Sequence, residues 1–332
     1  DLHPVNRRKR QMCIRDRIDT NAGAIAIQGA IGETTALTSL TINSDGAGTI
    51  EVANIGDSSG VGVSGATAIG NTNTTTLTLD GTVYKTTGAQ VYTATAGDNI
   101  DITNASNAAF TTTNTAITFG TANIELADGV DLTLDSGAGA GDITLVSIDG
   151  HSSEAVTIDA GTGTTSVGAI GAGTEIGAVT IGSAQNGGIT LNGAITTTGA
   201  VSLDGPVSLA TGAITVDSSA GNGAIDFLHT IDGAQNLTLS SGGGAINVAQ
   251  GIGLTNALSA LTINSGGSGT IEIFDIGDDS VGVTGATAIG NTSTTTLTLD
   301  GTVYKTTGAQ VYTATSGDNI DCLLYTSDAA DD

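Results

Sequence analysis

The chain has 332 residues, 50 of them glycine, and its 33 acidic residues against 8 basic ones give a formal net charge of −25. A surface this acidic repels nucleic-acid phosphates and anionic lipids, so neither is expected as a partner. No apolar run approaches the roughly 18 residues of a membrane helix, so this segment is not expected to insert into a membrane.

Residues 1–17 and 322–332 are predicted to be foreign to the protein. Residues 12–17 read Met-Cys-Ile-Arg-Asp-Arg and residues 322–327 read Cys-Leu-Leu-Tyr-Thr-Ser. Codons for these two strings can be written as reverse complements over most of their length, as expected of a sequencing adapter translated at each end. A basic arm and an acidic tail are the alternative interpretation. We expect the natural sequence to be the body, residues 18–321.

The body has an unusual set of titratable side chains. Lys85 and Lys305 are its two strongly basic residues, against 28 acidic ones, and it contains no cysteine. Its two histidines, His151 and His229, have no second histidine or cysteine at the spacing of zinc ligands, so we predict no metal site for them. Residues 137–142 resemble part of a calcium-binding nonapeptide repeat but lack two of its glycines.

A long internal duplication is the clearest feature of the body. Residues 66–101 return as residues 286–321 with two changes, and the similarity extends upstream of both segments. The predicted copies are residues 31–101 and 252–321, about 220 residues apart. A unit repeated with so few changes is typical of repeat proteins, in which each unit packs against its neighbours.

A finer repeat runs through the body as triplets of the form apolar–Thr/Ser–apolar. Alternate triplets start 22 to 24 residues apart, and clusters of Gly, Asn, Asp and Ser between them supply turns. Each triplet alternates with period two, so its apolar residues are expected to point inward and its hydroxyl outward. The triplets begin at Leu132, Ile143, Val156, Val179, Ile189, Val201, Ile214, Leu237 and Leu261.

This pattern predicts an all-β protein whose body is a right-handed parallel β-helix with one turn per 22–24 residues. A body of this length would hold roughly 13 turns at about 4.8 Å each, with Leu132, Val156, Val179 and Val201 aligned inside. Glycine and β-branched residues are poor helix formers, which argues against an α-helical repeat. Tandem β-sandwich repeats of the immunoglobulin type are the alternative fold.

The glycine-rich triplets, acidic balance and long duplication resemble the filamentous-haemagglutinin-like and autotransporter-passenger β-strand repeat adhesins. The resemblance covers residues 18–321 and rests on repeat style, without a short signature motif. It implies export to the cell surface of a Gram-negative-type bacterium and display as a fibre. The expected partners are surface glycans or proteins, or other copies of the fibre, with no cofactor.

The alternatives to the stalk or binding shaft of an adhesin are a polysaccharide lyase or hydrolase, an ice-binding protein and a purely structural spacer. Polysaccharide lyases and hydrolases also use β-helices, but they resemble one another in placing Arg or Lys beside acidic groups, and the body has no arginine. Asp278–Asp279 is more simply a solvated turn, so no catalytic, cofactor or metal residue is predicted. Ice binding would need a flat threonine array, and the outward-facing Thr-Leu-Thr string occurs only at residues 76–78 and 296–298. The tyrosines at positions 84, 92, 304 and 312 could form an exposed contact patch or cover a turn of the core.

Overall fold

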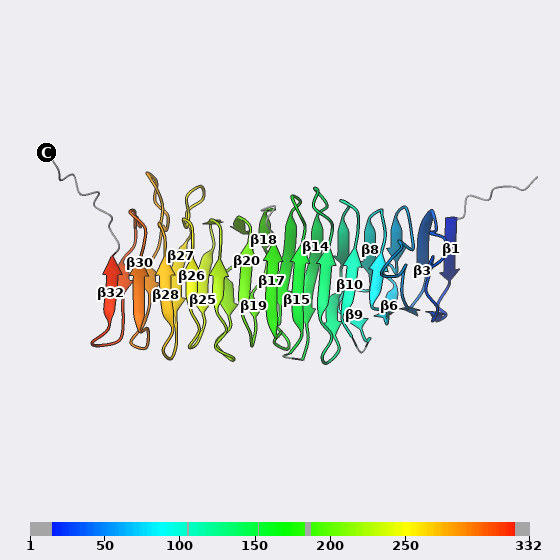
Figure 1. The fold of residues 1–332 in the computed structure, drawn as a ribbon, viewed down its shortest axis with the longest axis horizontal. Coiled ribbons are helices and arrows are strands. Elements are labelled where there is room, and N and C mark those ends of the chain that lie inside the picture. The colour runs from blue at the N-terminus through cyan, green and yellow to red at the C-terminus, as the bar shows by residue number, and fades with distance from the viewer. Residues whose placement is uncertain (1–14, 105, 152, 183–186, 323–332) are drawn as a thin grey trace, which may run out of the picture.

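The computed structural model describes residues 15–104, 106–151, 153–182 and 187–322. Most of the two predicted foreign segments, residues 1–14 and 323–332, lies outside the described residues. The described residues contain 32 strands and no helix, and they stack as one elongated β-solenoid of about 12 turns (Figure 1). The strands pair in parallel with those of neighbouring turns. The parallel β-helix prediction is therefore confirmed, antiparallel sandwiches are excluded for these residues, and the handedness stays a prediction.

The strands of each turn fall on three successive faces, and each face is a ladder of strands in register. Face 1 begins at the N-terminal end and continues beyond its last strand through the single bridges of Ile252, Ile276 and Tyr304. Its strands are β1 (Arg15–Thr20), β3 (Ser39–Ser44), β5 (Thr67–Ile69), β8 (Gln90–Thr93), β11 (Ile117–Gly120), β14 (Ile143–Asp149), β16 (Thr165–Ile170), β18 (Ile189–Leu191), β21 (Val207–Leu209) and β24 (Ile231–Asp232).

Face 2 follows face 1 in every turn, and the long strands β14 and β16 extend from one face onto the other, which joins both faces into one sheet. Its other strands are β2 (Ile25–Ile27), β4 (Gly48–Val52), β6 (Thr74–Leu79), β9 (Asn99–Ile102), β12 (Asn123–Leu126), β19 (Ile195–Thr196), β22 (Ile214–Asp217), β25 (Asn236–Ser240), β27 (Ala260–Asn264), β29 (Thr287–Ile289) and β31 (Gln310–Tyr312).

Face 3 completes the turn and forms the second sheet. It starts with the bridges of Ile31 and Ile55, which lead to Tyr84 in its first strand. Its strands are β7 (Val83–Lys85), β10 (Ala108–Thr111), β13 (Leu132–Asp135), β15 (Ala155–Asp159), β17 (Ala178–Gly182), β20 (Val201–Asp204), β23 (Ile225–Phe227), β26 (Ile246–Val248), β28 (Thr270–Ile273), β30 (Thr296–Leu299) and β32 (Asn319–Cys322).

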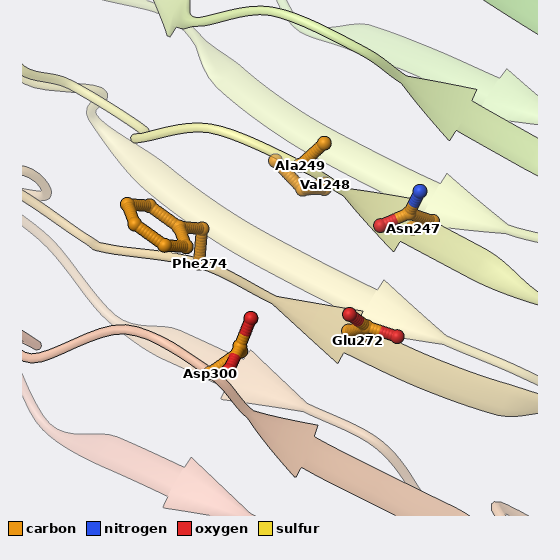
Figure 2. Close-up of a pocket in the computed structure, with 6 residues that line it drawn as sticks. All are labelled: Asn247, Val248, Ala249, Glu272, Phe274 and Asp300. Carbon is orange, nitrogen blue, oxygen red and sulfur yellow. The ribbon is translucent and has the colours of Figure 1, made fainter. Parts of the chain in front are cut away.

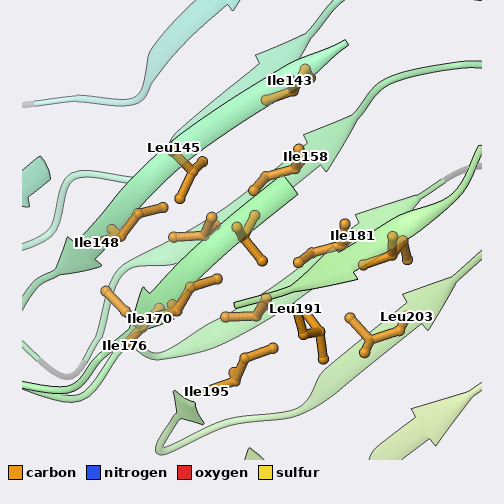
Figure 3. Close-up of a cluster of buried hydrophobic side chains, with 14 of the residues drawn as sticks. Ile143, Leu145, Ile148, Ile158, Ile170, Ile176, Ile181, Leu191, Ile195 and Leu203 are labelled. Carbon is orange, nitrogen blue, oxygen red and sulfur yellow. The ribbon is translucent and has the colours of Figure 1, made fainter. Parts of the chain in front are cut away.

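The core is a set of apolar columns inside the three faces. Leu132, Val156, Val179 and Val201 stack in register on face 3, each at most 1% exposed, as the triplet spacing predicts. Figure 3 shows how isoleucine and leucine side chains from all three faces converge on the same interior. Since one turn cannot enclose its own apolar side chains, each turn depends on its neighbours for burial.

The turns are not of one length. In the middle of the solenoid the register advances by 22 to 24 residues per turn, as between Leu132, Val156 and Val179. In the duplicated segments it advances further, by 27 residues from Ile50 to Leu77. Longer loops in these segments explain why the chain holds about 12 turns instead of the 13 that the triplet spacing predicts.

Aromatic side chains fill the core of the first copy. The Tyr84 and Phe110 rings stack with centroids 4.4 Å apart, and the Tyr92 and Phe119 rings stack at 4.9 Å. All four side chains are fully buried, in columns that continue elsewhere with isoleucine and leucine. The interior is therefore wide enough for stacked rings, and the sparse aromatic content does not reflect a narrow core.

The two copies of the duplication lie on different faces. Ile50 is on face 2, whereas the matching Ile271 is on face 3. Tyr84 is on face 3, and its counterpart Tyr304 is on face 1. Following the ladders from one copy to the other gives nine full turns plus one face, so the second copy is rotated by one third of a turn.

We expect Phe110→Ala to lower the free energy of unfolding by about 3–5 kcal/mol, because it removes a fully buried ring from between the other aromatic rings. Phe274→Ala is the matched control, since Phe274 is 39% exposed and should cost much less. Urea denaturation followed by circular dichroism measures both changes. Equal losses for the two variants would contradict the aromatic column as part of the core.

Candidate interaction surface

The outward positions of the strands form files of hydroxyl side chains, as predicted. On face 3, Thr133, Thr157, Thr180 and Ser202 occupy successive turns at one register position. Face 1 has a similar file from Thr118 to Ser208. Next to this second file the outward positions of β14 and β16 include Val146 and Gly168, so the file is one residue wide. Such a file lacks the breadth of the flat threonine array that ice binding would need.

Of the two interpretations of the tyrosines, the exposed contact patch is wrong for the first copy. Tyr84 and Tyr92 point into the core, where the Tyr84 hydroxyl donates to the Val52 carbonyl at 3.0 Å and the Tyr92 hydroxyl donates to Gln90 Oε1 at 3.0 Å. In the second copy, Tyr304 and Tyr312 are half-buried near the C-terminal end of the solenoid, and desolvation raises the pKa of Tyr304 to about 12. These tyrosines belong to the interior columns, which was the other interpretation of the sequence.

The two histidines contact different groups, and the adjacent aspartates lie in a turn. His151 Nδ1 is 3.0 Å from the Leu126 carbonyl, and His229 Nε2 is 3.2 Å from Asp204 Oδ1. Asp278 and Asp279 are exposed in a turn, where Asp278 Oδ1 accepts the Ser280 amide at 2.7 Å. Across the part of the chain that the structure describes, no group of three or more His, Cys, Asp or Glu side chains could hold a metal ion. No helix long and apolar enough to cross a membrane occurs in that part either.

Several aspartates connect one turn to the next. Asp142 Oδ1 accepts the backbone amide and the hydroxyl of Thr164, each at 2.8 Å, and this is the aspartate of the calcium-like segment 137–142. Asp275 Oδ1 likewise accepts the amides of Thr302 at 2.6 Å and Val303 at 2.9 Å. Carboxylates accept such hydrogen bonds strongly, and these bonds join the backbone of one turn to a side chain of the turn before it. Part of the acidic surplus therefore stabilises the solenoid.

A second set of carboxylates is stacked on face 2. Glu51, Thr78, Asp101, Glu125 and Asp149 occupy one register position in successive turns. Desolvation raises the pKa of Asp101, and desolvation followed by repulsion from Asp149 raises the pKa of Glu125. Because like charges repel along this file, ionisation at neutral pH opposes folding there, and protonation relieves that repulsion.

Glu154 is a buried carboxylate in a loop between strands, and no sequence pattern predicts its burial. It is fully buried, and it accepts hydrogen bonds from the amides of Gly129 at 3.0 Å and His151 at 2.6 Å and from Ser153 Oγ at 2.9 Å. Desolvation favours the protonated form, but these hydrogen bonds outweigh it and lower the pKa of Glu154 to about 2. Glu154 thus anchors two loops of neighbouring turns as an ionised group.

A recess of about 260 Å³ lies on the outside of face 3 in the second copy, over β26, β28 and β30. Figure 2 shows the Phe274 ring on one side of it and the carboxylates of Glu272 and Asp300 on the other. Asn247, Val248 and Ala249 of the preceding turn complete the lining. The sequence interpretation missed this site. The sequence does contain one sign of this recess, a difference between matching positions of the two copies: Ala53 in the first copy corresponds to Phe274 in the second.

We expect Asp275→Asn to leave the free energy of unfolding nearly unchanged, because Asn54 Oδ1 makes the same two contacts in the first copy, with the amides of Thr82 and Val83. Asp275→Ala leaves both amides without this acceptor and should cost about 1–3 kcal/mol. Urea denaturation of the two variants checks this difference. Equal destabilisation by both substitutions would show that the charge matters and the acceptor geometry does not.

We expect ionised Glu154 to make stability depend on pH between 4.5, its ordinary pKa, and about 2. A lowered pKa in the folded state stabilises the fold above pH 4.5, and that contribution, roughly 2–3 kcal/mol, is lost as pH falls toward 2. In Glu154→Gln the unfolding free energy should be lower at pH 6, and its difference from the wild type should shrink on acidification.

Urea denaturation between pH 2 and pH 6 measures that difference. The raised pKa values of Asp101 and Glu125 contribute equally to both proteins, so their titration cancels when the two are subtracted. A difference between wild type and Glu154→Gln that stays constant with pH would contradict an ionised Glu154 in the folded state.

Comparisons with known proteins identify no relative: no family model, no curated protein and no solved structure matches the chain. The two copies of the internal duplication can still be compared with each other. Among the positions at which the copies differ are Ala53 and Asn54, which Phe274 and Asp275 replace in the second copy. The structure thus places the chain among β-solenoid repeat proteins by fold alone.

Proposed function

We propose that this chain is a non-catalytic structural and adhesive repeat region of a large exported bacterial surface protein, serving as the stalk or binding shaft of an adhesin. The observation that carries the proposal is the continuous parallel pairing of strands over about 12 turns, which makes the described residues one extended body (Figure 1). At about 4.8 Å per turn, that body is about 60 Å long. A rod of this kind can hold a binding surface away from its point of attachment.

The surface chemistry supports the same proposal. Short turns connect the strands, and aspartates such as Asp142 and Asp275 use their carboxylates to join one turn to the next. The high negative charge opposes non-specific aggregation of the rod. Export to the surface of a Gram-negative-type bacterium, and surface glycans, proteins or other copies of the fibre as partners, follow from the resemblance in repeat style and are part of the proposal.

The stacked carboxylates of face 2 are the nearest equivalent of an acidic catalytic group. Asp101 and Glu125 are adjacent on this file, and the raised pKa of each fits a general acid. The two strongly basic side chains of the body lie elsewhere, where Lys85 Nζ contacts the Ser58 carbonyl and Lys305 Nζ contacts the Asp279 carbonyl. A lyase that relies on a base beside its acid is therefore less well supported than a shaft.

We expect beads that carry the purified full chain through a C-terminal tag to adhere to bacterial or epithelial cells more than beads carrying a globular protein of equal mass and charge. Bead counts after washing measure adhesion, and an antibody to an N-terminal tag measures whether the rod presents its far end. Adhesion would support the binding shaft, and access to the far end alone would support a passive stalk. Release of unsaturated or reducing sugar ends from polygalacturonate would overturn the non-catalytic assignment.

A further inference from the structure

Among the described residues, Phe274 is the aromatic side chain with an exposed ring on the outside of the solenoid. The chain has four phenylalanines, and Phe110, Phe119 and Phe227 are fully buried, whereas Phe274 is 39% exposed. It follows Ile273, which points into the core, so the alternation of β28 places the ring outward. With Ala249 of the preceding turn it gives the recess an apolar wall.

The opposite wall of the recess is acidic. The carboxylates of Glu272 and Asp300 face the same space as the ring (Figure 2), and neither makes a side-chain hydrogen bond or ion pair within the described residues. Asp275, next to the ring in sequence, has its carboxylate committed to the amides of the following turn. No basic side chain lines the recess, so its two free carboxylates have no counter-charge.

We propose that this recess binds an organic ammonium group carried on an apolar stem. The face of an aromatic ring attracts a cation, and the two carboxylates add Coulomb attraction from the other side. An anion would be repelled by both carboxylates and by the charge of the whole chain. A neutral ligand would have to desolvate two carboxylates without neutralising them.

The size of the recess sets the size of the group. Its volume of about 260 Å³ is just below the roughly 300 Å³ at which pockets for whole drug-sized ligands begin, so it fits one head group. Leu228, 36% exposed, is two turns before Phe274 in the same outward file, with Ala249 between them. An alkyl stem can lie along these apolar side chains while the ammonium group occupies the recess. The lysine side chain of a partner protein and a small free amine share this chemistry.

The first copy supplies an internal control for the site. It retains Glu51 and Asp80 at the positions of Glu272 and Asp300, but has Ala53 in place of Phe274. In addition, Thr103 Oγ1 lies 3.4 Å from Asp80 Oδ1, so that carboxylate has a partner. This proposal rests on the proposed function in one respect: it names the recess as a contact site of the binding shaft. Binding of an ammonium group to the recess can be measured whether or not the chain mediates adhesion.

The test is a titration of the full chain, with labelled phenylalanine rings observed by NMR, against three five-carbon probes: cadaverine, pentanol and glutarate. We expect cadaverine to shift the Phe274 signals, with little effect from the neutral and anionic probes. Phe274→Ala should weaken cadaverine binding by about threefold to thirtyfold, the contribution of one cation–π contact. Phe274→Leu, which keeps apolar bulk without the ring face, should weaken it similarly, and the paired variant Glu272→Gln/Asp300→Asn should weaken it with Phe274 intact.

Ala53→Phe in the first copy should add a second, weaker ring signal that responds to cadaverine. Equal shifts with pentanol would overturn the ammonium assignment in favour of simple apolar contact. Cadaverine binding that is unchanged in Phe274→Ala would reduce the effect to attraction by the acidic surface and would also overturn the site.

A lysine-containing peptide binding more tightly than cadaverine would identify a protein partner as the source of the ammonium group, and the reverse order would identify a free amine. A loss of bead adhesion with intact cadaverine binding would count against the proposed function alone.

Discussion

Each turn of this solenoid hydrogen-bonds through its backbone to the turns on either side, so a side chain lies directly above its counterpart one turn earlier. That constraint stacks side chains of the same chemical kind: Val156 lies on Leu132 in the core, and Thr157 lies on Thr133 outside. Stacking is favourable for apolar and hydroxyl side chains and unfavourable for like charges. At Glu125, desolvation and then repulsion from the stacked Asp149 raise the pKa of the carboxyl group. The core columns, the hydroxyl files and the acidic file all follow from this one register.

The same constraint explains how the acidic residues are distributed. A carboxylate in a turn is useful where it accepts an amide from the next turn, as Asp142 and Asp275 do, because the backbone there has no strand partner. Glu154 also accepts amides of neighbouring loops, but from a fully buried position, where its hydrogen bonds outweigh desolvation and lower its pKa. Asp300 and Glu272 lack such contacts, and this separates a carboxylate available for a ligand from one used by the fold.

Much of the fold could be predicted because the triplets reveal which residues share a column, and Leu132, Val156, Val179 and Val201 do so. The orientation of the tyrosines could not. In Val91-Tyr92 two apolar residues are adjacent, and period-two alternation does not say which points inward; the structure buries Tyr92 and leaves Val91 39% exposed. The Phe274 recess was hidden for the same reason, since Ile273 and Phe274 are equally plausible core residues by sequence. The face that each copy occupies could not be predicted either. It depends on the lengths of individual loops, which the pattern of apolar residues does not indicate.

The rotation of the second copy by one face has a consequence for avidity. Consecutive copies spaced by nine and one third turns would lie about 45 Å apart along the axis and point in three directions in succession. A flat target surface could then engage only every third copy at once, which limits simultaneous contacts in an array of such copies. In exchange, a fibre built this way would present a binding side whatever its roll about its own axis.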